Sequence, residues 1–246
     1  MNEQLERWYL FASQRCSIRK YRSSPISADI EELETFARSI SAGGVRIVIS
    51  KNRDVFSPIF LAFGKITGTS AYAAFIAKRD TPRWKIGYVG EMFILECCAR
   101  GFGTCWLGAS YKKESVATDL KLNEDEYIAC ITPVGVSDER YIGRPRKGLD
   151  ALTGLKPEEL RELPEWQKLA LECARNAPSA VNGQPWRFNV SEAGLSIIQT
   201  SRNYGYGELD CGIAMLHMEL GAAHGGVYGD WRVAGERVRA DFQPAI

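Results

Sequence analysis

Apolar residues recur along the chain at the spacings of helices and strands. A helical repeat places Leu5, Trp8 and Ala12 on one face of an amphipathic helix. Runs rich in β-branched, aromatic and small apolar residues predict buried strands elsewhere. The predicted helices span residues 3–14, 29–39, 87–100, 166–175 and 211–223, and the predicted strands span 45–50, 71–77, 127–136, 187–190 and 195–200. Between the first two helices, residues 15–21 are predicted to be extended.

A change in composition divides the chain near its middle. Residues 140–165 contain three prolines and many charges, which predicts a linker with one or two helical turns. The sequence therefore predicts two halves, residues 1–150 and 151–246, packed closely together. Two segments of equal length, 90–103 and 212–225, each begin and end with Gly around an apolar helical core, which predicts a weak internal repeat. Chance is the alternative, because many buried helices end at Gly.

Charge and hydropathy exclude several classes of protein. The chain has 31 Lys and Arg against 30 Asp and Glu, so neither a nucleic-acid-binding nor a polybasic membrane-binding protein is expected. The longest uncharged stretch, residues 66–77, is shorter than the ~20 residues of a membrane-spanning helix. The first residues do not have the pattern of a signal peptide.

The seven cysteines favour a reducing compartment. Their number is odd, and the sequence has neither a Cys-x-x-Cys pair nor a His at metal-ligand spacing. This predicts a cytoplasmic protein with free thiols and no metal site. Cys97 and Cys98 lie in an apolar helical pattern, which favours buried small hydrophobic residues over a vicinal redox pair.

Two arginine-containing segments could bind an anion. In the extended segment RCSIRKY, side chains at alternate positions share a face, so Arg15, Ser17 and Arg19 project together while Cys16 and Ile18 turn into the body. Two guanidinium groups beside a hydroxyl suit a phosphate; the alternative is a solvated edge strand. In RPRKG, Arg144 and Arg146 share a face if extended, and the alternative is a solvated basic linker.

Two further segments could approach a flat ligand. NAPSAVNGQPW, residues 176–186, forms an ordered loop in which Ser179, Asn182 and Gln184 carry neutral polar groups, suited to a heterocycle with carbonyls and ring nitrogens. The alternative is a helix end followed by a turn. GFGTCWLGAS, residues 101–110, has Gly-rich backbone that a ligand could approach closely, or is a helix C-cap plus turn.

Together these segments resemble the nitroreductase family of FMN-dependent oxidoreductases. RCSIRKY is similar to the family's Arg-Ser-x-Arg start, and APSAVNGQPW fits its Ala-Pro-Ser-x-x-Asn-x-Gln-Pro-Trp loop closely. The resemblance also includes GYVGEMFILECCARGFGTCWLG and RPRKGL, and covers most of the chain. It implies an α+β fold in which a central, mainly antiparallel sheet is flanked by helices.

The sequence departs from the family pattern in the place of the Ala-Pro-Ser loop. Family members carry this loop soon after the N-terminal arginines, whereas here it lies in the second half, which lacks an Arg-Ser-x-Arg element of its own. In the family, FMN lies at a homodimer interface and takes its phosphate grip from one subunit and this loop from the other. We therefore expect a monomeric pseudodimer whose two halves mimic the homodimer, with one intact flavin site and one degenerate site. The resemblance is nearest to a nitroreductase subgroup built this way.

The resemblance assigns the candidate site residue by residue, with no catalytic side chain. Those implied at the phosphate and ribityl end of FMN are Arg15, Cys16 (through its backbone), Ser17, Arg19, Arg144 and Arg146. Those implied at the isoalloxazine are Pro178, Ser179 and Asn182, with Leu107, Gly108 and Ala109 at the place where the family offers a backbone N–H to flavin N5. This sequence lacks the Glu-Gly often found there. Gln184, Pro185 and Trp186 are interpreted as supports, and Arg19 is a hypothetical positive charge near N1.

The resemblance implies that NAD(P)H reduces FMN and that a small electron-poor acceptor, such as a nitroaromatic or a quinone, then takes the electrons. His217 and His224 are predicted to be structural. A related enzyme with dehalogenase or flavin-modifying activity is one alternative. A non-catalytic flavin-binding or sensor protein is another, and an α/β domain without a cofactor is a third.

Overall fold

The computed structural model describes residues 3–56, 64–139, 143–192, 194–235 and 238–245. The chain divides into two compact units. The middle unit is Gln14–Gly143, and the terminal unit combines Met1–Ser13 with Arg144–Ile246. This division differs from the predicted halves, residues 1–150 and 151–246, because the N-terminal segment belongs with the C-terminal part of the chain.

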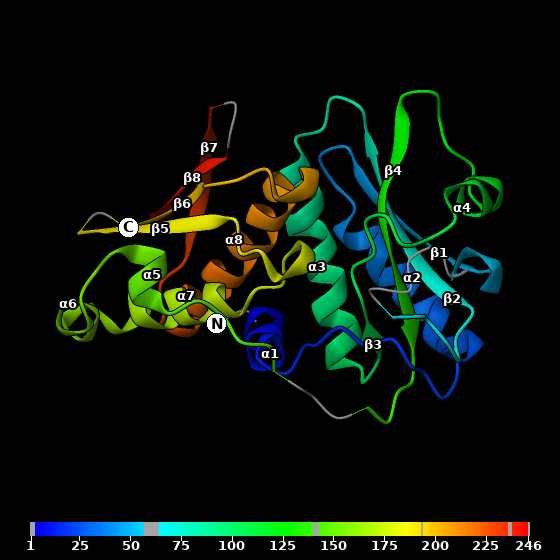
Figure 1. The fold of residues 1–246 in the computed structure, drawn as a ribbon, viewed down its shortest axis with the longest axis horizontal. Coiled ribbons are helices and arrows are strands. Elements are labelled where there is room, and N and C mark those ends of the chain that lie inside the picture. The colour runs from blue at the N-terminus through cyan, green and yellow to red at the C-terminus, as the bar shows by residue number, and fades with distance from the viewer. Residues whose placement is uncertain (1–2, 57–63, 140–142, 193, 236–237, 246) are drawn as a thin grey trace. The chain divides into compact units, whose positions relative to one another are not determined.

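The middle unit contains a four-stranded antiparallel sheet of order β1-β2-β4-β3 (Figure 1). Its elements are α2 (Ser27–Ile40), β1 (Val45–Lys51), the short 3-10 helix η1 (Arg53–Phe56), β2 (Ala71–Lys78), α3 (Arg83–Ala99), β3 (Gly103–Thr104), α4 (Lys113–Asp119) and β4 (Glu126–Gly135). The order leaves β2 and β4 in the interior of the sheet. We find the predicted strands and helices at these places, together with α4, which the sequence pattern does not predict.

The central strand β2 is buried on both faces, which explains its continuous apolar run. On one face, Tyr72 and Ile76 join a cluster that includes Val116 and Ile131. On the other face, Phe75 meets Phe93 of α3 edge to face, with ring centroids 6.2 Å apart. A strand covered on both sides shows no alternation of polar and apolar residues, so it is recognised by composition rather than by period.

The terminal unit contains a second four-stranded antiparallel sheet, of order β5-β6-β8-β7. Its elements are α1 (Glu3–Ala12), α5 (Leu149–Thr153), α6 (Pro157–Glu162), α7 (Glu165–Asn176), η3 (Ala180–Asn182), β5 (Trp186–Ser191), β6 (Gly194–Gln199), η4 (Asn203–Gly205), α8 (Gly207–His224), β7 (Gly229–Ala234) and β8 (Arg239–Pro244). Helix α8 is buried along almost its whole length and packs against α7, α1 and β6. It forms the core of this unit.

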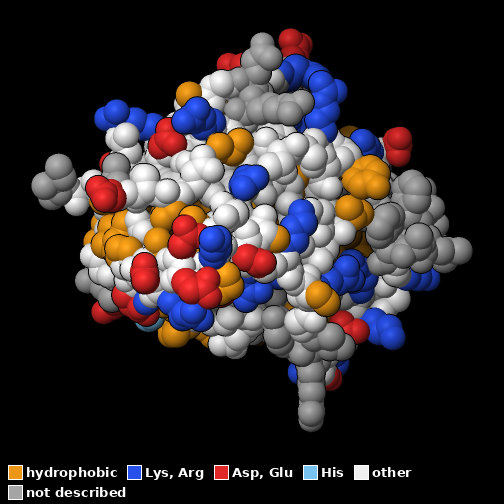
Figure 2. All heavy atoms as spheres, turned by 60° about the vertical axis from the view of Figure 1, so that its left-hand side comes forward, with side chains coloured by type: hydrophobic (Ala, Val, Ile, Leu, Met, Phe, Trp, Pro, Cys, Tyr) orange, Lys and Arg blue, Asp and Glu red, His pale blue; other side chains and the backbone are white. Residues whose placement is uncertain are grey.

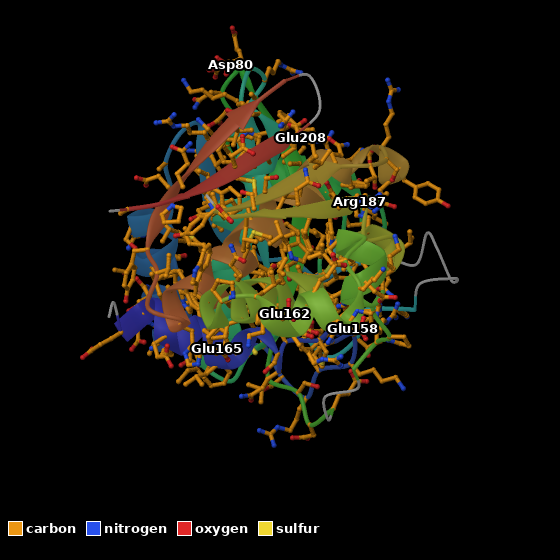
Figure 3. The ribbon with its side chains drawn as sticks, turned by 90° about the vertical axis from the view of Figure 1, so that its left-hand side faces the viewer. Asp80, Glu158, Glu162, Glu165, Arg187 and Glu208 are labelled. Carbon is orange, nitrogen blue, oxygen red and sulfur yellow. The ribbon has the colours of Figure 1, made fainter. Side chains whose placement is uncertain are left out.

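The predicted linker, residues 140–165, forms short helices at the surface; its residues 140–142 lie outside the described residues. Figure 3 shows Glu158 and Glu162 on α6 and Glu165 at the start of α7, all exposed. Arg187 lies on β5 in the same view. The one or two helical turns predicted for this charged segment are therefore confirmed as α5 and α6.

Helix α1 is attached to the end of α8 by polar and aromatic contacts. The Nδ1 atom of His224 lies 2.9 Å from Oε2 of Glu6, and the His224 ring stacks on Tyr9 with centroids 3.9 Å apart. Burial of Tyr9, together with nearby acidic groups, raises the pKa of its hydroxyl. His224 thus helps to hold α1 against the end of α8.

The two units repeat the same order of elements. In each, a helix (α2 or α7) is followed by two paired strands, a long buried helix (α3 or α8) and two further strands. The terminal unit also has α1, α5 and α6 before α7, and the middle unit has α4 between its last two strands. The two sheets have the same strand order, with the fourth strand of each between the second and the third. The two segments of the predicted repeat, 90–103 and 212–225, lie mostly on α3 and α8.

Acidic and basic side chains are interspersed over the face shown in Figure 2, in agreement with the formal net charge of +1. Within the described parts of the chain, no helix combines the length and hydropathy needed to cross a membrane. All seven cysteines are free. Burial raises the pKa of the Cys97 thiol well above its ordinary value, so this residue behaves as a small hydrophobic side chain.

A bidentate ion pair joins β1 to the start of β4. Arg46 Nε and Nη2 donate to Glu126 Oε1 and Oε2 at 2.7 and 2.8 Å, and the backbone N–H of Asn123 donates to Oε2 at 2.9 Å. The Arg46 hydrogen bond, aided by Asn123, lowers the pKa of the Glu126 carboxyl from 4.5 to about 2. A carboxyl with a lowered pKa stabilises the fold above its ordinary pKa, and this contribution is lost as the pH falls through the folded-state pKa.

We expect Glu126→Gln to lower the free energy of unfolding at pH 7 by about 1–2 kcal/mol, since Arg46 is partly exposed and solvent weakens the pair. The loss should shrink as the pH falls from 4.5 toward 2. Urea denaturation at pH 7 and near pH 3 (a value about midway in that interval) measures both effects. Glu124→Gln, at an exposed neighbouring position, is the control. Equal losses at both pH values would contradict the assignment.

Candidate functional site

The predicted phosphate-binding segment runs along the sheet of the middle unit, beside β3. Ser17 forms a parallel bridge with Thr104, and the backbone N–H of Ile18 donates to the Thr104 carbonyl at 2.8 Å. The Ile18 side chain is buried in the core, and Cys16 packs against the same cluster. A Cβ at Gly103 would lie 3.0 Å from Ile18, so this glycine permits the close approach. The extended backbone predicted for residues 15–21 is therefore confirmed.

Arg15 is buried beside an acidic residue that the sequence interpretation did not include. Its exposed fraction is 7%, and its Nε atom lies 3.8 Å from Oε1 of Glu91, a residue of α3 that is fully buried. Trp106 Nε1 donates to the other carboxylate oxygen of Glu91 at 2.8 Å. Glu91 is thus held between an indole and a guanidinium group.

The Nε and Nη1 atoms of Arg15 are buried without a hydrogen-bond partner among the described residues. Leaving charged N–H groups unsatisfied is costly, because water no longer solvates them. A phosphate would satisfy them, since guanidinium and phosphate form charge-assisted hydrogen bonds. The arrangement therefore fits an anion at Arg15 and contradicts the alternative of a solvated edge at this position.

Arg19 and Ser17 are half-buried and lie close together. Arg19 Nη1 is 3.5 Å from the Ser17 carbonyl oxygen, at the limit of a hydrogen bond. Their side chains therefore remain candidates for the same anion as Arg15.

The three residues predicted to face flavin N5 differ in burial, and the backbone of Leu107 is already hydrogen-bonded within the sheet. The N–H of Leu107 donates to the Ile131 carbonyl at 2.8 Å, and the Leu107 carbonyl accepts from Ile131 at 3.0 Å. Leu107 is buried, Gly108 is half-buried and Ala109 is exposed. The N–H of Leu107 is thus committed to the sheet, and Gly108 and Ala109 are the better candidates for a ligand contact.

In the terminal unit, the RPRKG segment is bound to the Ala-Pro-Ser loop. Arg146 Nη1 donates to Asn182 Oδ1 at 2.6 Å, and Asn182 Nδ2 donates to the Pro145 carbonyl at 2.9 Å. Lys147 donates from its backbone N–H to Gln184 Oε1 at 2.8 Å and from Nζ to the carbonyls of Gly183 and Gln184. The loop is therefore formed and held by its own unit.

The two arginines of RPRKG have different surroundings. Arg144 is exposed, as the basic-linker alternative expects. Arg146 is half-buried and also donates from Nη2 to the Asn176 carbonyl at 3.2 Å. The Arg146 guanidinium thus stabilises the Ala-Pro-Ser loop through these hydrogen bonds.

The residues interpreted as supports of this loop are buried. Gln184 Nε2 donates to the Asn182 carbonyl at 3.1 Å, and the Gln184 N–H donates to Ser179 Oγ at 2.9 Å. Pro178 is buried and Ser179 is half-buried. His217 is also structural, since it is fully buried with Nδ1 3.2 Å from the Cys173 carbonyl.

The candidate residues form two sets, one in each unit. The middle unit holds Arg15, Cys16, Ser17, Arg19, Leu107, Gly108 and Ala109, and the terminal unit holds Arg144, Arg146, Pro178, Ser179 and Asn182. The sequence interpretation did not include Glu91 or Lys147. Glu91 has a sequence signal, because it is a carboxylate within a mainly apolar stretch of α3. No group of His, Cys, Asp or Glu side chains suited to a metal ion occurs among the described residues.

Paired antiparallel sheets, each with a long buried helix, define a nitroreductase-like α+β fold. The family model described as "Putative TM nitroreductase" matches residues 10–222, and the chain belongs to this family. The fold is thus confirmed, with two four-stranded sheets in place of one central sheet.

The solved structures to which the chain is similar match different shares of it. A "putative nitroreductase" from Thermotoga maritima has 20% identity and a TM-score of 0.69, over 96% of this chain and 93% of that chain. A nitroreductase family protein from Streptococcus pneumoniae has 11% identity and a TM-score of 0.50, over 60% of this chain and 98% of that chain. An FMN-dependent nitroreductase from Clostridium difficile has 16% identity and a TM-score of 0.44, over 53% and 87%. No curated protein matches this chain.

Proposed function

We propose that the protein is an FMN-dependent oxidoreductase of the nitroreductase type, which uses NAD(P)H to reduce a small electron-poor acceptor such as a nitroaromatic or a quinone. Its membership of the family supports an oxidoreductase. The observation that carries the flavin assignment is Arg15, whose buried Nε and Nη1 lack hydrogen-bond partners among the described residues and suit the FMN phosphate.

The protein's own residues would bind and orient the cofactor. Arg15, Ser17 and Arg19 would hold the phosphate and ribityl end, with Glu91 fixing Arg15. The formed loop with Pro178, Ser179 and Asn182 would lie against the isoalloxazine, and the backbone near Gly108 and Ala109 would face N5. FMN would supply the redox chemistry, accepting a hydride from NAD(P)H and returning two electrons to the acceptor. With a quinone, NAD(P)H, quinone and one proton give NAD(P)⁺ and hydroquinone.

The helix, two strands, helix and two strands that both units share, with the same strand order in the two sheets, support an origin by internal duplication. The loop between helix and first strand is short in the middle unit, residues 41–44, whereas in the terminal unit it is the Pro178–Asn182 region. We therefore propose a monomer with one FMN, in which the second equivalent site has degenerated. Free cysteines support a cytoplasmic location.

The visible absorption spectrum of the purified protein, before and after addition of FMN, tests the cofactor assignment. We expect about one FMN per chain after denaturation and quantification, from the single phosphate grip that Arg15 supplies. NADH or NADPH oxidation with menadione or nitrofurazone then tests turnover. Bound FMN without turnover would indicate a flavin-binding protein, and absence of binding would overturn the proposal.

A further inference from the structure

Two neighbouring loops of the terminal unit contain non-glycine residues whose backbone conformation is strained. Within the described chain, the non-glycine residues with positive φ are Val181, Asn182, Gln184, Asn203 and Tyr204, with φ between 41° and 57°. A β-branched residue rarely adopts this conformation, because its Cβ substituents clash with the backbone. Strain of this kind persists where surrounding contacts enforce it, and it occurs often at functional sites.

One buried carboxylate connects both strained loops. Asp210, in the first turns of α8, is 2% exposed. Its Oδ1 accepts the backbone N–H of Ala180 at 3.0 Å, and its Oδ2 accepts Asn203 Nδ2 at 2.6 Å. Hydrogen bonds to an ionised group are stronger than neutral ones, so both loops are fixed to a helix that forms the core of the unit.

Asn203 completes the connection. Its Nδ2 also donates to the Ala180 carbonyl at 2.9 Å, so both backbone groups of Ala180 are bonded to the Asp210–Asn203 pair. A Cβ at Gly183 would lie 2.4 Å from Asn203 Oδ1, which shows how closely the two loops pack. The same contacts leave Val181 and Tyr204 53% and 84% exposed, so burial of these apolar side chains does not stabilise the loops.

We infer that Asp210, acting through Ala180 and Asn203, is the positioning residue that holds the Pro178–Gln184 loop in the conformation that contacts the flavin. This inference rests on the proposed function. Because Asp210 is buried, it would act through the loop and not by contact with the flavin. Its role is to keep the backbone of the loop ordered before the ligand arrives, which reduces the ordering cost of binding.

Asp210→Asn tests this role with little change of shape. The amide retains an acceptor for one donor but presents an N–H to the other, so one of the two hydrogen bonds is lost. We expect the FMN dissociation constant to rise about tenfold, as for loss of a charge-assisted hydrogen bond. The absorption and fluorescence of the bound flavin should also change, because the loop lies against the isoalloxazine; a residue that only stabilised the fold would leave them unchanged.

Two further measurements separate positioning from stability. In the protein without flavin, amide hydrogen exchange of residues 180–184 should become faster in D210N, while that of α7 stays the same. Glu208→Gln, the same chemical change in the first turn of α8 at a half-buried position labelled in Figure 3, should alter neither exchange nor affinity. If D210N does not fold, Asn203→Gly removes the hydrogen bonds of the half-buried Asn203 side chain and tolerates the positive φ.

The outcomes distinguish this inference from the proposed function. FMN binding by the wild-type protein, with an unchanged dissociation constant, spectrum and exchange in the variants, overturns the role of Asp210 alone. Absence of FMN binding by the wild-type protein overturns the proposed function and this inference with it. Weaker binding with an altered flavin spectrum and faster exchange at residues 180–184 supports both.

Discussion

Replacing Arg15 by Met should weaken FMN binding by about 100-fold and leave the binding of riboflavin almost unchanged. The expected size corresponds to two lost hydrogen bonds between a guanidinium group and a phosphate, at about 1.5 kcal/mol each. Riboflavin has no phosphate, so it does not report on this contact. Fluorescence titration of both ligands against the wild-type and R15M proteins measures the difference. An equal loss for both ligands would show that Arg15 does not bind the phosphate.

The double variant R15M/E91Q separates the effect of Arg15 on FMN binding from its effect on the free energy of unfolding. R15M leaves Glu91 buried without its arginine, which we expect to lower the free energy of unfolding by about 3 kcal/mol. R15M/E91Q removes both charges and keeps an acceptor for Trp106, so stability should largely return. FMN affinity should stay low. Recovery of FMN affinity in the double variant would show that Arg15 acts only through the fold.

Gly221→Ala should lower the free energy of unfolding by about 2 kcal/mol, even though alanine favours helix. A Cβ at this position of α8 would lie 2.3 Å from the Leu169 carbonyl oxygen and 2.6 Å from the Ala170 Cα, both backbone atoms of α7. Backbone cannot rotate away as a side chain can, so the two helices must separate. Thermal or urea denaturation measures the loss.

Gly90→Ala is the matched comparison, in the corresponding helix of the middle unit. A Cβ there would meet Trp106 at 2.4 Å and Phe75 at 3.2 Å, which are side-chain atoms. The gain in helix propensity is the same, and Trp106 is only partly buried, so we expect a smaller loss than for G221A. Equal losses in the two variants would contradict the argument from backbone contact.

Most of the fold could be predicted from local patterns, and the exceptions have physical reasons. Strand β2 and helices α3 and α8 have long apolar runs, and the structure confirms them. The hairpin of β7 and β8 was not predicted, because it lacks a continuous apolar run. Its alternation of buried Ala240 and Phe242 with polar residues is itself the signal of a half-buried strand. Helix α4 was missed because its seven residues include a single buried side chain, Val116.

The candidate site was predictable in its residue types but not in its contacts. The alternation in RCSIRKY predicts the extended backbone and the inward Ile18, both of which are confirmed. It cannot show that Arg15 meets Glu91, because that pair depends on how α3 packs beneath the segment. Likewise, the hydrogen bond from Arg146 to Asn182 joins residues that are far apart in sequence. The assignment of these residues to FMN stays a prediction until binding is measured.

The position of α1 has a consequence for folding during synthesis. Residues 14–143 contain every element of the middle unit, so that unit can form as soon as it leaves the ribosome. Helix α1 is made before the middle unit, but its contacts lie on α7 and α8, which are made after that unit. Until α7 and α8 have been made, the apolar face of α1, with Trp8 and Ala12, lacks the helices against which it packs in the folded protein. Helix α1 is thus made before the middle unit but reaches its final packing only after α7 and α8 have been made.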